Sequence, residues 1–132
     1  MPDRDRILAA IDSAYADRKA GNTDALAHFW APGATFRIAG EPSLLTPLRT
    51  GTAATGEAVA ELIQLIRFHE YRRLDAVVEG NRAALRWEID CSIGDGPVYR
   101  TEIAEFWEFD EGLRAKSLLQ FVDTAQLAKM MV

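Results

Sequence analysis

The sequence has few of the residues that most often identify an activity. Its 132 residues include one cysteine and two histidines. A single cysteine excludes an intramolecular disulfide, and two distant histidines without a ligand motif do not indicate a metal site. The sequence also lacks a Gly-x-Ser-x-Gly motif, a phosphate-binding loop and a dinucleotide fingerprint. We therefore expect no metal and no other cofactor.

Positive charge and long apolar runs are also scarce. The net charge is -5 and no basic stripe stands out, which argues against nucleic acid as a partner. No apolar run approaches the ~20 residues needed to cross a bilayer, so no membrane contact is expected. The charged start, Met1–Arg6, does not resemble a secretory signal, which favours the cytoplasm. The length suits one domain, residues 1–132, with a real hydrophobic core.

The first half of the chain has the spacing of helices. Over Arg4–Ala20, an apolar side forms at intervals of three and four residues, with Asp3 as a candidate N-cap and Gly21 after the end. That side consists of Ile7, Leu8, Ile11, Ala14, Tyr15 and Arg18. The pattern further predicts a short helix from Thr23 or Asp24 to Trp30, a strand over Ala34–Ala39 and a helix over Glu57–His69. Between them, residues 40–51 hold two prolines and two glycines and predict an irregular loop, long enough to be a lid.

The second half changes to the period of two that is typical of strands. The predicted strands are Tyr71–Val78, Arg82–Ile93, Pro97–Phe109 and Leu113–Val122, joined by short glycine-containing turns typical of hairpins. A closing helix is predicted over Ala125–Met131, with Asp123 as its cap. Three helices followed by antiparallel strands indicate an α+β domain with the helices packed on one face of the sheet.

One carboxylate interrupts an apolar face of the predicted Pro97–Phe109 strand. Alternation places Glu105 beside Ile103, Trp107 and Phe109. A buried carboxylate is costly unless it is paired, hydrogen-bonded or protonated through a raised pKa. Glu105 is therefore a candidate general acid or neutral hydrogen-bond donor. The alternative is a core carboxylate paired with an arginine or a tyrosine hydroxyl.

Other polar residues are weaker candidates. Tyr15 could aim its hydroxyl into the interior, although core packing is the commoner role. Alternation alone leaves open whether Gln120 or Leu119 faces inward on the last strand. His28 is a weaker candidate for acid–base chemistry. His69 is predicted to cap the C-terminal end of the helix over Glu57–His69. Cys91 is predicted to be a small core residue.

The opposite face of the predicted sheet is charged. Arg86, Glu88 and Asp90 alternate outward on one strand, with Arg100 and Glu102 on the next. Cross-strand ion pairs on a solvated or dimer-facing surface explain this pattern.

Several segments, taken in order, resemble a known superfamily. They are residues 20–26 (AGNTDAL), 29–36 (FWAPGATF), 50–54 (TGTAA), 105–112 (EFWEFDEG) and 119–124 (LQFVDT). Together they resemble the SnoaL-like and ketosteroid-isomerase-like branch of the nuclear transport factor 2-like superfamily. The resemblance implies a cone-shaped, cystatin-like fold whose curved, mainly antiparallel sheet encloses a pocket, with Gln120 facing inward. The expected pocket walls are Trp30, Phe36, Ile38, Trp87, Ile89, Trp107 and Leu118.

The resemblance does not carry over the isomerase machinery as a whole. Ketosteroid isomerases use a tyrosine on the first helix, an aspartate base on the first strand and a protonated acid on a later strand. In this chain the base position falls on Ile38 and the tyrosine position on Ala14, one residue from Tyr15. Only the later acid has a counterpart, Glu105. Steroid-type isomerisation by that arrangement is therefore not expected.

Two classes of function follow. The first is cofactor-free acid–base catalysis on a small apolar molecule with a carbonyl or epoxide, with Glu105 as the acid and Tyr15 and Gln120 as hydrogen-bond partners. The second is a non-catalytic ligand-binding or association module. The resemblance and the outward-facing Ala104 and Phe106 also predict a homodimer through the outer face of the sheet.

Overall fold

The computed structural model describes residues 3–22, 24–25, 28–39 and 65–130. The elements in chain order are helix α1 (Arg4–Ala20), strands β1 (Trp30–Ala39), β2 (Ile66–Glu79), β3 (Arg82–Ile93), β4 (Tyr99–Phe109) and β5 (Ala115–Phe121), and helix α5 (Thr124–Met130). The strands form one sheet in the order β1-β5-β4-β3-β2. The α+β class is confirmed.

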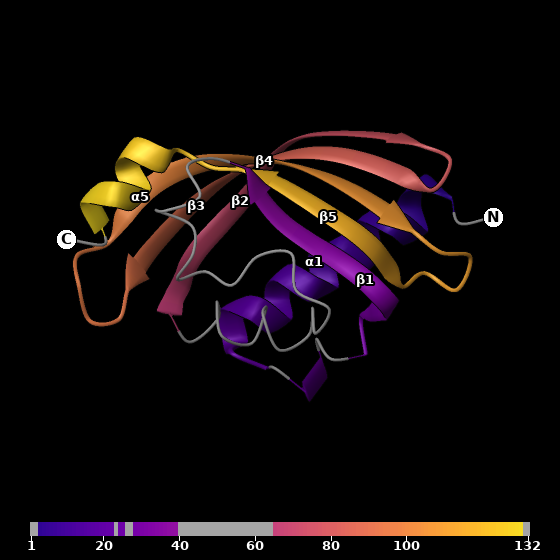
Figure 1. Ribbon diagram of the computed structural model, residues 1–132, viewed down its shortest axis with the longest axis horizontal. Helices are drawn as coiled ribbons and strands as arrows, with labels where there is room; N and C mark the ends of the chain where they lie inside the picture. Colours follow the sequence, from indigo (N-terminus) through magenta and orange to yellow (C-terminus); the bar gives the residue numbers. More distant parts are fainter. Residues whose placement is uncertain (1–2, 23, 26–27, 40–64, 131–132) are drawn as a thin grey trace.

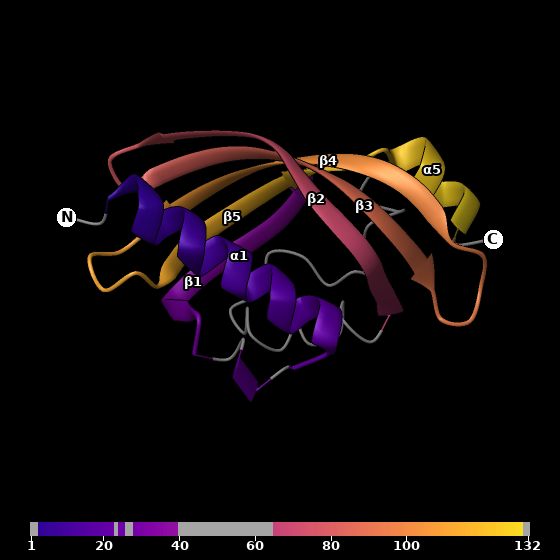
Figure 2. The same ribbon diagram turned by 180° about the vertical axis from the view of Figure 1, so that it is seen from behind.

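The sheet is curved and its concave side covers α1. β1 and β5 run parallel, and every other neighbouring pair is antiparallel. Figures 1 and 2 show α1 crossing the sheet on one side and α5 lying at the far end of the strands. Within the described ranges, α1 and α5 are the two helices that pack on the sheet, whereas three N-terminal helices were expected.

The ends of both helices follow the predicted capping chemistry. The Asp3 carboxylate accepts a hydrogen bond from the Arg6 backbone N–H at 2.9 Å. Gly21 ends α1 with a φ of 73°, a left-handed conformation that glycine adopts without steric cost. Asp123 accepts from the Gln126 backbone N–H at 3.0 Å, so it caps α5 as predicted.

Two segments that were predicted to end helices begin strands instead, at Trp30 and at residues 66–69. Trp30 begins β1 instead of ending a helix, because its backbone pairs with Ala115 of β5. Residues 66–69 begin β2, since Ile66 pairs with Ile93 of β3. His69 therefore caps no helix, and its Nε2 lies 2.8 Å from the Ser92 hydroxyl. The predicted loop over residues 40–51 and most of the predicted helix over Glu57–His69 lie outside the described residues.

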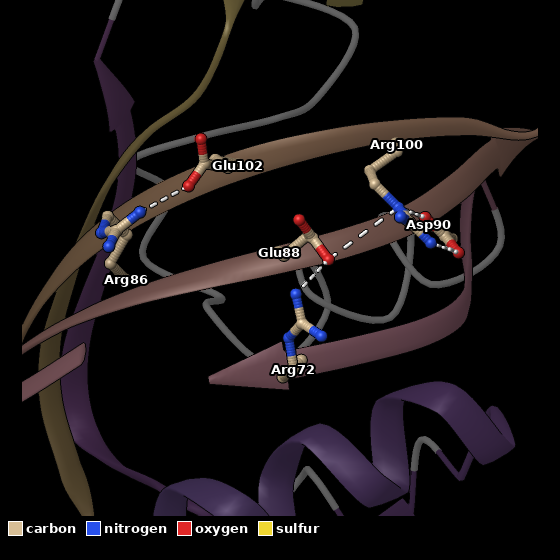
Figure 3. A network of polar contacts seen from close by, with 6 residues as sticks. All are labelled: Arg72, Arg86, Glu88, Asp90, Arg100 and Glu102. Atoms are coloured by element: carbon tan, nitrogen blue, oxygen red, sulfur yellow. Dashed lines mark hydrogen bonds and ion pairs between the residues drawn. The ribbon is translucent and has the colours of Figure 1, made fainter. Parts of the chain in front are cut away.

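The two faces of the sheet have opposite character. The inward positions of β3 and β4 are buried, including Trp87, Ile89 and Phe109. The outward charges form ion pairs across strands, as predicted: Arg72 and Arg100 approach Glu88, Arg100 also bonds to Asp90, and Arg86 bonds to Glu102 (Figure 3). This contrast fixes which face of each strand lines the interior.

Candidate functional site

Glu105 lies at the centre of the concave face and is completely buried. In β4 it pairs with Leu85 of β3 on one side and with Gln120 of β5 on the other. Trp107, two positions along the same strand, shares its face because successive side chains alternate. The strand register therefore gathers polar groups from three strands around one carboxylate.

Four donors fill the two oxygens of this carboxylate. Oε1 accepts from the indole N–H groups of Trp87 at 2.6 Å and Trp107 at 2.8 Å. Oε2 accepts from the Tyr15 hydroxyl at 2.8 Å and from Gln120 Nε2 at 3.0 Å. An ionised carboxylate offers about four acceptor positions, so this arrangement matches the charged form.

Tyr15 is held in place by its ring as well as its hydroxyl. Its ring stacks on Trp87 with centroids 3.9 Å apart and an interplanar angle of 16°. Burial raises the pKa of the Tyr15 hydroxyl well above its ordinary value, and the charge of Glu105 raises it further. The hydroxyl is therefore a fixed donor from α1 to the sheet.

Burial and hydrogen bonding act in opposite directions on Glu105. Removal from water raises the pKa of its carboxyl group, and the four donors partly offset that rise by stabilising the charged form. The raised pKa agrees in direction with the sequence prediction. Of the two pairings considered from the sequence, the structure shows the tyrosine hydroxyl as partner.

A small cavity, here called the first cavity, lies between the sheet and α5. Its volume is about 70 Å³. Apolar side chains from β1, β2, β3, β4 and α5 make most of its wall. Arg18, Gln120, Asp123 and Gln126 are among its polar members. It is an apolar cavity with a few polar groups, the usual composition of a small-molecule site.

The second cavity lies between α1 and β1. Its volume is about 40 Å³, and Tyr15, Trp30, Phe36, Trp107 and Leu118 line it. Arg18, Phe68 and Gln120 line both cavities, so these three side chains stand between them. Both volumes together fall below the ~150 Å³ of an apolar cavity that takes up benzene. Among the described residues, neither cavity alone has space for a ring-sized ligand.

The predicted pocket residues are distributed over both cavities. Trp30, Phe36, Trp107 and Leu118 line the second cavity, and Ile38 and Ile89 line the first. Trp87 and Glu105 are not among the described residues that line either one. They lie behind the cavity wall, where Tyr15 and Gln120 connect Glu105 to the interior.

Sequence reasoning missed several residues that line the cavities, and Arg18, Phe68 and Gln126 are among them. Arg18 lines both cavities from α1, and its guanidinium lies 4.1 Å from the centre of the Phe68 ring. Gln126 lines the first cavity from α5. The inward position of Arg18 could be inferred from the sequence, since it falls on the apolar side of α1 at the spacing of Ala14 and Tyr15. The positions of Phe68 and Gln126 could not be inferred, because they depend on long-range packing.

Of the remaining candidates, Cys91 lines the first cavity, whereas the two histidines lie apart from this interior. His28 and His69 line neither cavity among the described residues, and Cys91 is buried, with burial raising the pKa of its thiol. No group of three histidine, cysteine, aspartate or glutamate side chains within the described ranges is placed to hold a metal ion. In the same ranges, no helix is both long and apolar enough to cross a membrane.

Comparison with known proteins identifies the family and the fold. A family profile described as a SnoaL-like domain matches residues 8–116. No curated protein matches the sequence significantly.

Three solved structures illustrate the likeness. A protein from Rhodopseudomonas palustris, assigned provisionally as an isomerase, superposes with a TM-score of 0.80 at 21% identity, covering 99% of this chain and 98% of that one. An LEH-like epoxide hydrolase from M. tuberculosis gives 0.74 at 13% identity, with coverages of 98% and 92%. An NTF2-like protein of unknown function from Burkholderia pseudomallei gives 0.73 at 14% identity, with coverages of 96% and 97%. At these identities the likeness shows a shared fold alone.

Proposed function

The chain belongs to the SnoaL-like domain family, and from that premise we propose that it binds a small, largely apolar molecule with a carbonyl or epoxide oxygen in the interior of the cone. The ligand spans both cavities and shifts one or more of the side chains that line both of them, which are Arg18, Phe68 and Gln120. The observation that carries the proposal is the apolar interior with polar groups at a few fixed points. Gln120 contacts the ligand, and Glu105 fixes the orientation of Gln120 and Tyr15.

Isothermal titration with acetophenone, a small aromatic ketone, tests this proposal. Ala14 is buried and lines the second cavity, so Ala14→Leu adds three carbon atoms to a space of about 40 Å³. We expect saturable binding to the wild type and a loss of about tenfold or more in the variant. Ala84→Leu, on the outer face of β3, is the matched control and leaves binding unchanged. Absence of saturable binding, or equal losses in the two variants, would refute the proposal.

A second candidate function is acid–base catalysis, and the raised pKa of the Glu105 carboxyl group favours it. Isomerase-type reactions begin with removal of a proton next to a carbonyl. For Glu105 to take that proton, one of its four donors must move away, and Gln120 is the donor that lines both cavities. The neighbours named above supply only fold-level support for this chemistry.

Deuterium exchange into the methyl group of acetophenone in D₂O, followed by proton NMR, separates the two candidates. Catalysis predicts that the wild type accelerates exchange and that Glu105→Gln does not. An exchange rate equal to that of buffer, under conditions where acetophenone binds, would leave binding as the function.

We also propose that a second copy of the chain covers the apolar part of the outer face. Phe106 of β4 and Phe121 of β5 are 50% and 45% exposed, and their rings are in contact with centroids 5.9 Å apart. Light scattering after size exclusion should give a dimer that Phe106→Glu dissociates. Val98→Glu, at a site 56% exposed before β4, is the control and should remain dimeric. A monomeric wild type would contradict this proposal.

A further inference from the structure

Polar side chains of the interior hold hydrogen-bond donors that have no partner in the described ranges. Among the described residues, three buried side-chain atoms have no hydrogen-bond partner: Arg18 Nε, Trp30 Nε1 and Gln126 Nε2. All three are donors, and all three belong to residues that line the cavities. Buried donors left unpaired are costly, and native proteins hold few of them. Within the part of the chain that the structure describes, these three donors have no acceptor within hydrogen-bond distance.

Among these three residues, Arg18 has the strongest need of a hydrogen-bond partner, because its side chain is charged. Arg18 is half-buried, its Nε is buried without a partner in the described part of the chain, and an arginine stays charged under all ordinary conditions, so a donor of a charged group is left unsatisfied. The oxygens of Glu105 are filled by four other donors. Asp123 also lines the first cavity, but it caps α5 and forms no ion pair with Arg18. The contact that Arg18 does make, with the face of Phe68, is a cation–π contact that leaves its N–H donors free.

We propose that the ligand carries a carboxylate, which Arg18 receives through Nε and the guanidinium edge, with Gln126 as a second donor. The planar guanidinium matches a carboxylate with two parallel hydrogen bonds. The apolar part of the ligand then extends past Phe68 and Gln120 toward the second cavity. This inference rests on the proposed binding function and adds the charge of the ligand to it.

The position of Arg18 supports this reading. Desolvation lowers the pKa of Arg18 to about 10, and the neighbouring Tyr15 and Glu105 partly offset this fall. A ligand carboxylate would supply the direct partner that this guanidinium lacks among the described residues. The net charge of -5 repels anions in general, so a preference for an anionic ligand would have to arise locally.

Paired titrations with benzoate and acetophenone test the inference. The two probes have nearly the same shape and size and differ in charge. Hydrogen bonds to charged groups predict that the wild type binds benzoate about tenfold to hundredfold more tightly than acetophenone. Arg18→Met should abolish this preference while retaining acetophenone, and Arg18→Lys should retain part of it because it keeps the charge without the planar edge. Arg114→Met, at an exposed arginine remote from both cavities, is the control and should leave both affinities unchanged.

The outcomes separate the two proposals. Equal affinities for the two probes, or an Arg18→Met protein that still prefers benzoate, would overturn the carboxylate assignment and leave the binding function intact. Failure of both probes to bind would overturn both. A second measurement needs no ligand. Because Arg18 has an unpaired buried donor, Arg18→Met should be at least as stable to urea as the wild type. A clear loss of stability would show that Arg18 serves the fold instead.

Discussion

Replacing Glu105 should distinguish a carboxylate that only packs from one that organises the interior. Its four donors come from α1, β3, β4 and β5. Glu105→Ala leaves all four without an acceptor, and each buried unpaired donor costs about 1–3 kcal/mol. The full set costs roughly 4–12 kcal/mol, which is comparable to the ~5–15 kcal/mol total stability of a typical domain. We therefore expect Glu105→Ala to be unfolded or nearly so.

Glu105→Gln should behave differently because it keeps one acceptor oxygen. The two indole N–H groups can only donate, so the amide oxygen must face Trp87 and Trp107. The amide NH₂ then faces Tyr15 and Gln120, both of which can turn to accept. Each donor keeps a partner, so the loss should be far smaller than that of Glu105→Ala, about 1–3 kcal/mol, and it comes from the changed geometry of the hydrogen bonds.

Urea denaturation followed by circular dichroism measures these free energies of unfolding. Glu102→Ala is a suitable control, since Glu102 lies on the outer face of the same strand in an exposed ion pair with Arg86, worth at most ~1 kcal/mol. A loss below about 1 kcal/mol for Glu105→Ala, or equal losses for the alanine and glutamine variants, would refute the account of Glu105 as the hub of the interior.

Three further predictions follow from the titration of buried groups. Because burial raises the folded-state pKa of Glu105, its contribution to stability is fully present below the unfolded pKa and is lost as pH rises through the folded value. The stability advantage of wild type over Glu105→Gln should therefore shrink as pH rises from about 4, and a widening gap would contradict this direction. The raised pKa of Tyr15 predicts that it stays protonated until alkaline unfolding, so Tyr15→Phe should give the same phenolate absorbance as wild type below that transition. The Cys91 thiol is buried in the wall of the first cavity and should react with a thiol-specific reagent much more slowly than a free thiol, and rapid reaction of the native protein would contradict its burial.

Much of the sheet could be predicted because alternation fixes the direction of side chains. Once Ile103, Trp107 and Phe109 are assigned inward, Glu105 must share their face. The sequence does not determine the register between neighbouring strands. That Gln120 lies directly opposite Glu105, while Phe121 faces outward, depends on the pairing of β4 with β5.

The wrong predictions share one physical cause. Residues 66–69 continue an apolar helical spacing along the chain, yet their backbone forms a ladder with β3 that extends β2 to 14 residues. Tertiary pairing overrides local propensity in such cases. Trp30 likewise enters β1 through a parallel partner 85 positions away, Ala115.

Arg18 shows why the site was only partly predictable. It falls near the C-terminal end of α1, where a cation is favoured by the helix dipole and is usually solvated. Its location over Phe68 and between two cavities arises from the packing of α1 against β2 and the rest of the sheet. The sequence could place it on the apolar side of the helix but could not show what lies opposite.

The most direct test of the central claim, that the interior of the cone binds a small molecule, uses the three tryptophans as reporters. Trp30 and Trp107 line the second cavity, whereas the indole N–H of Trp87 is bonded to Glu105 behind the wall. In an indole ¹H–¹⁵N titration with acetophenone, the account predicts saturable shifts that are largest for Trp30, whose N–H has no partner among the described residues. Indole signals that do not move at saturating probe would contradict it.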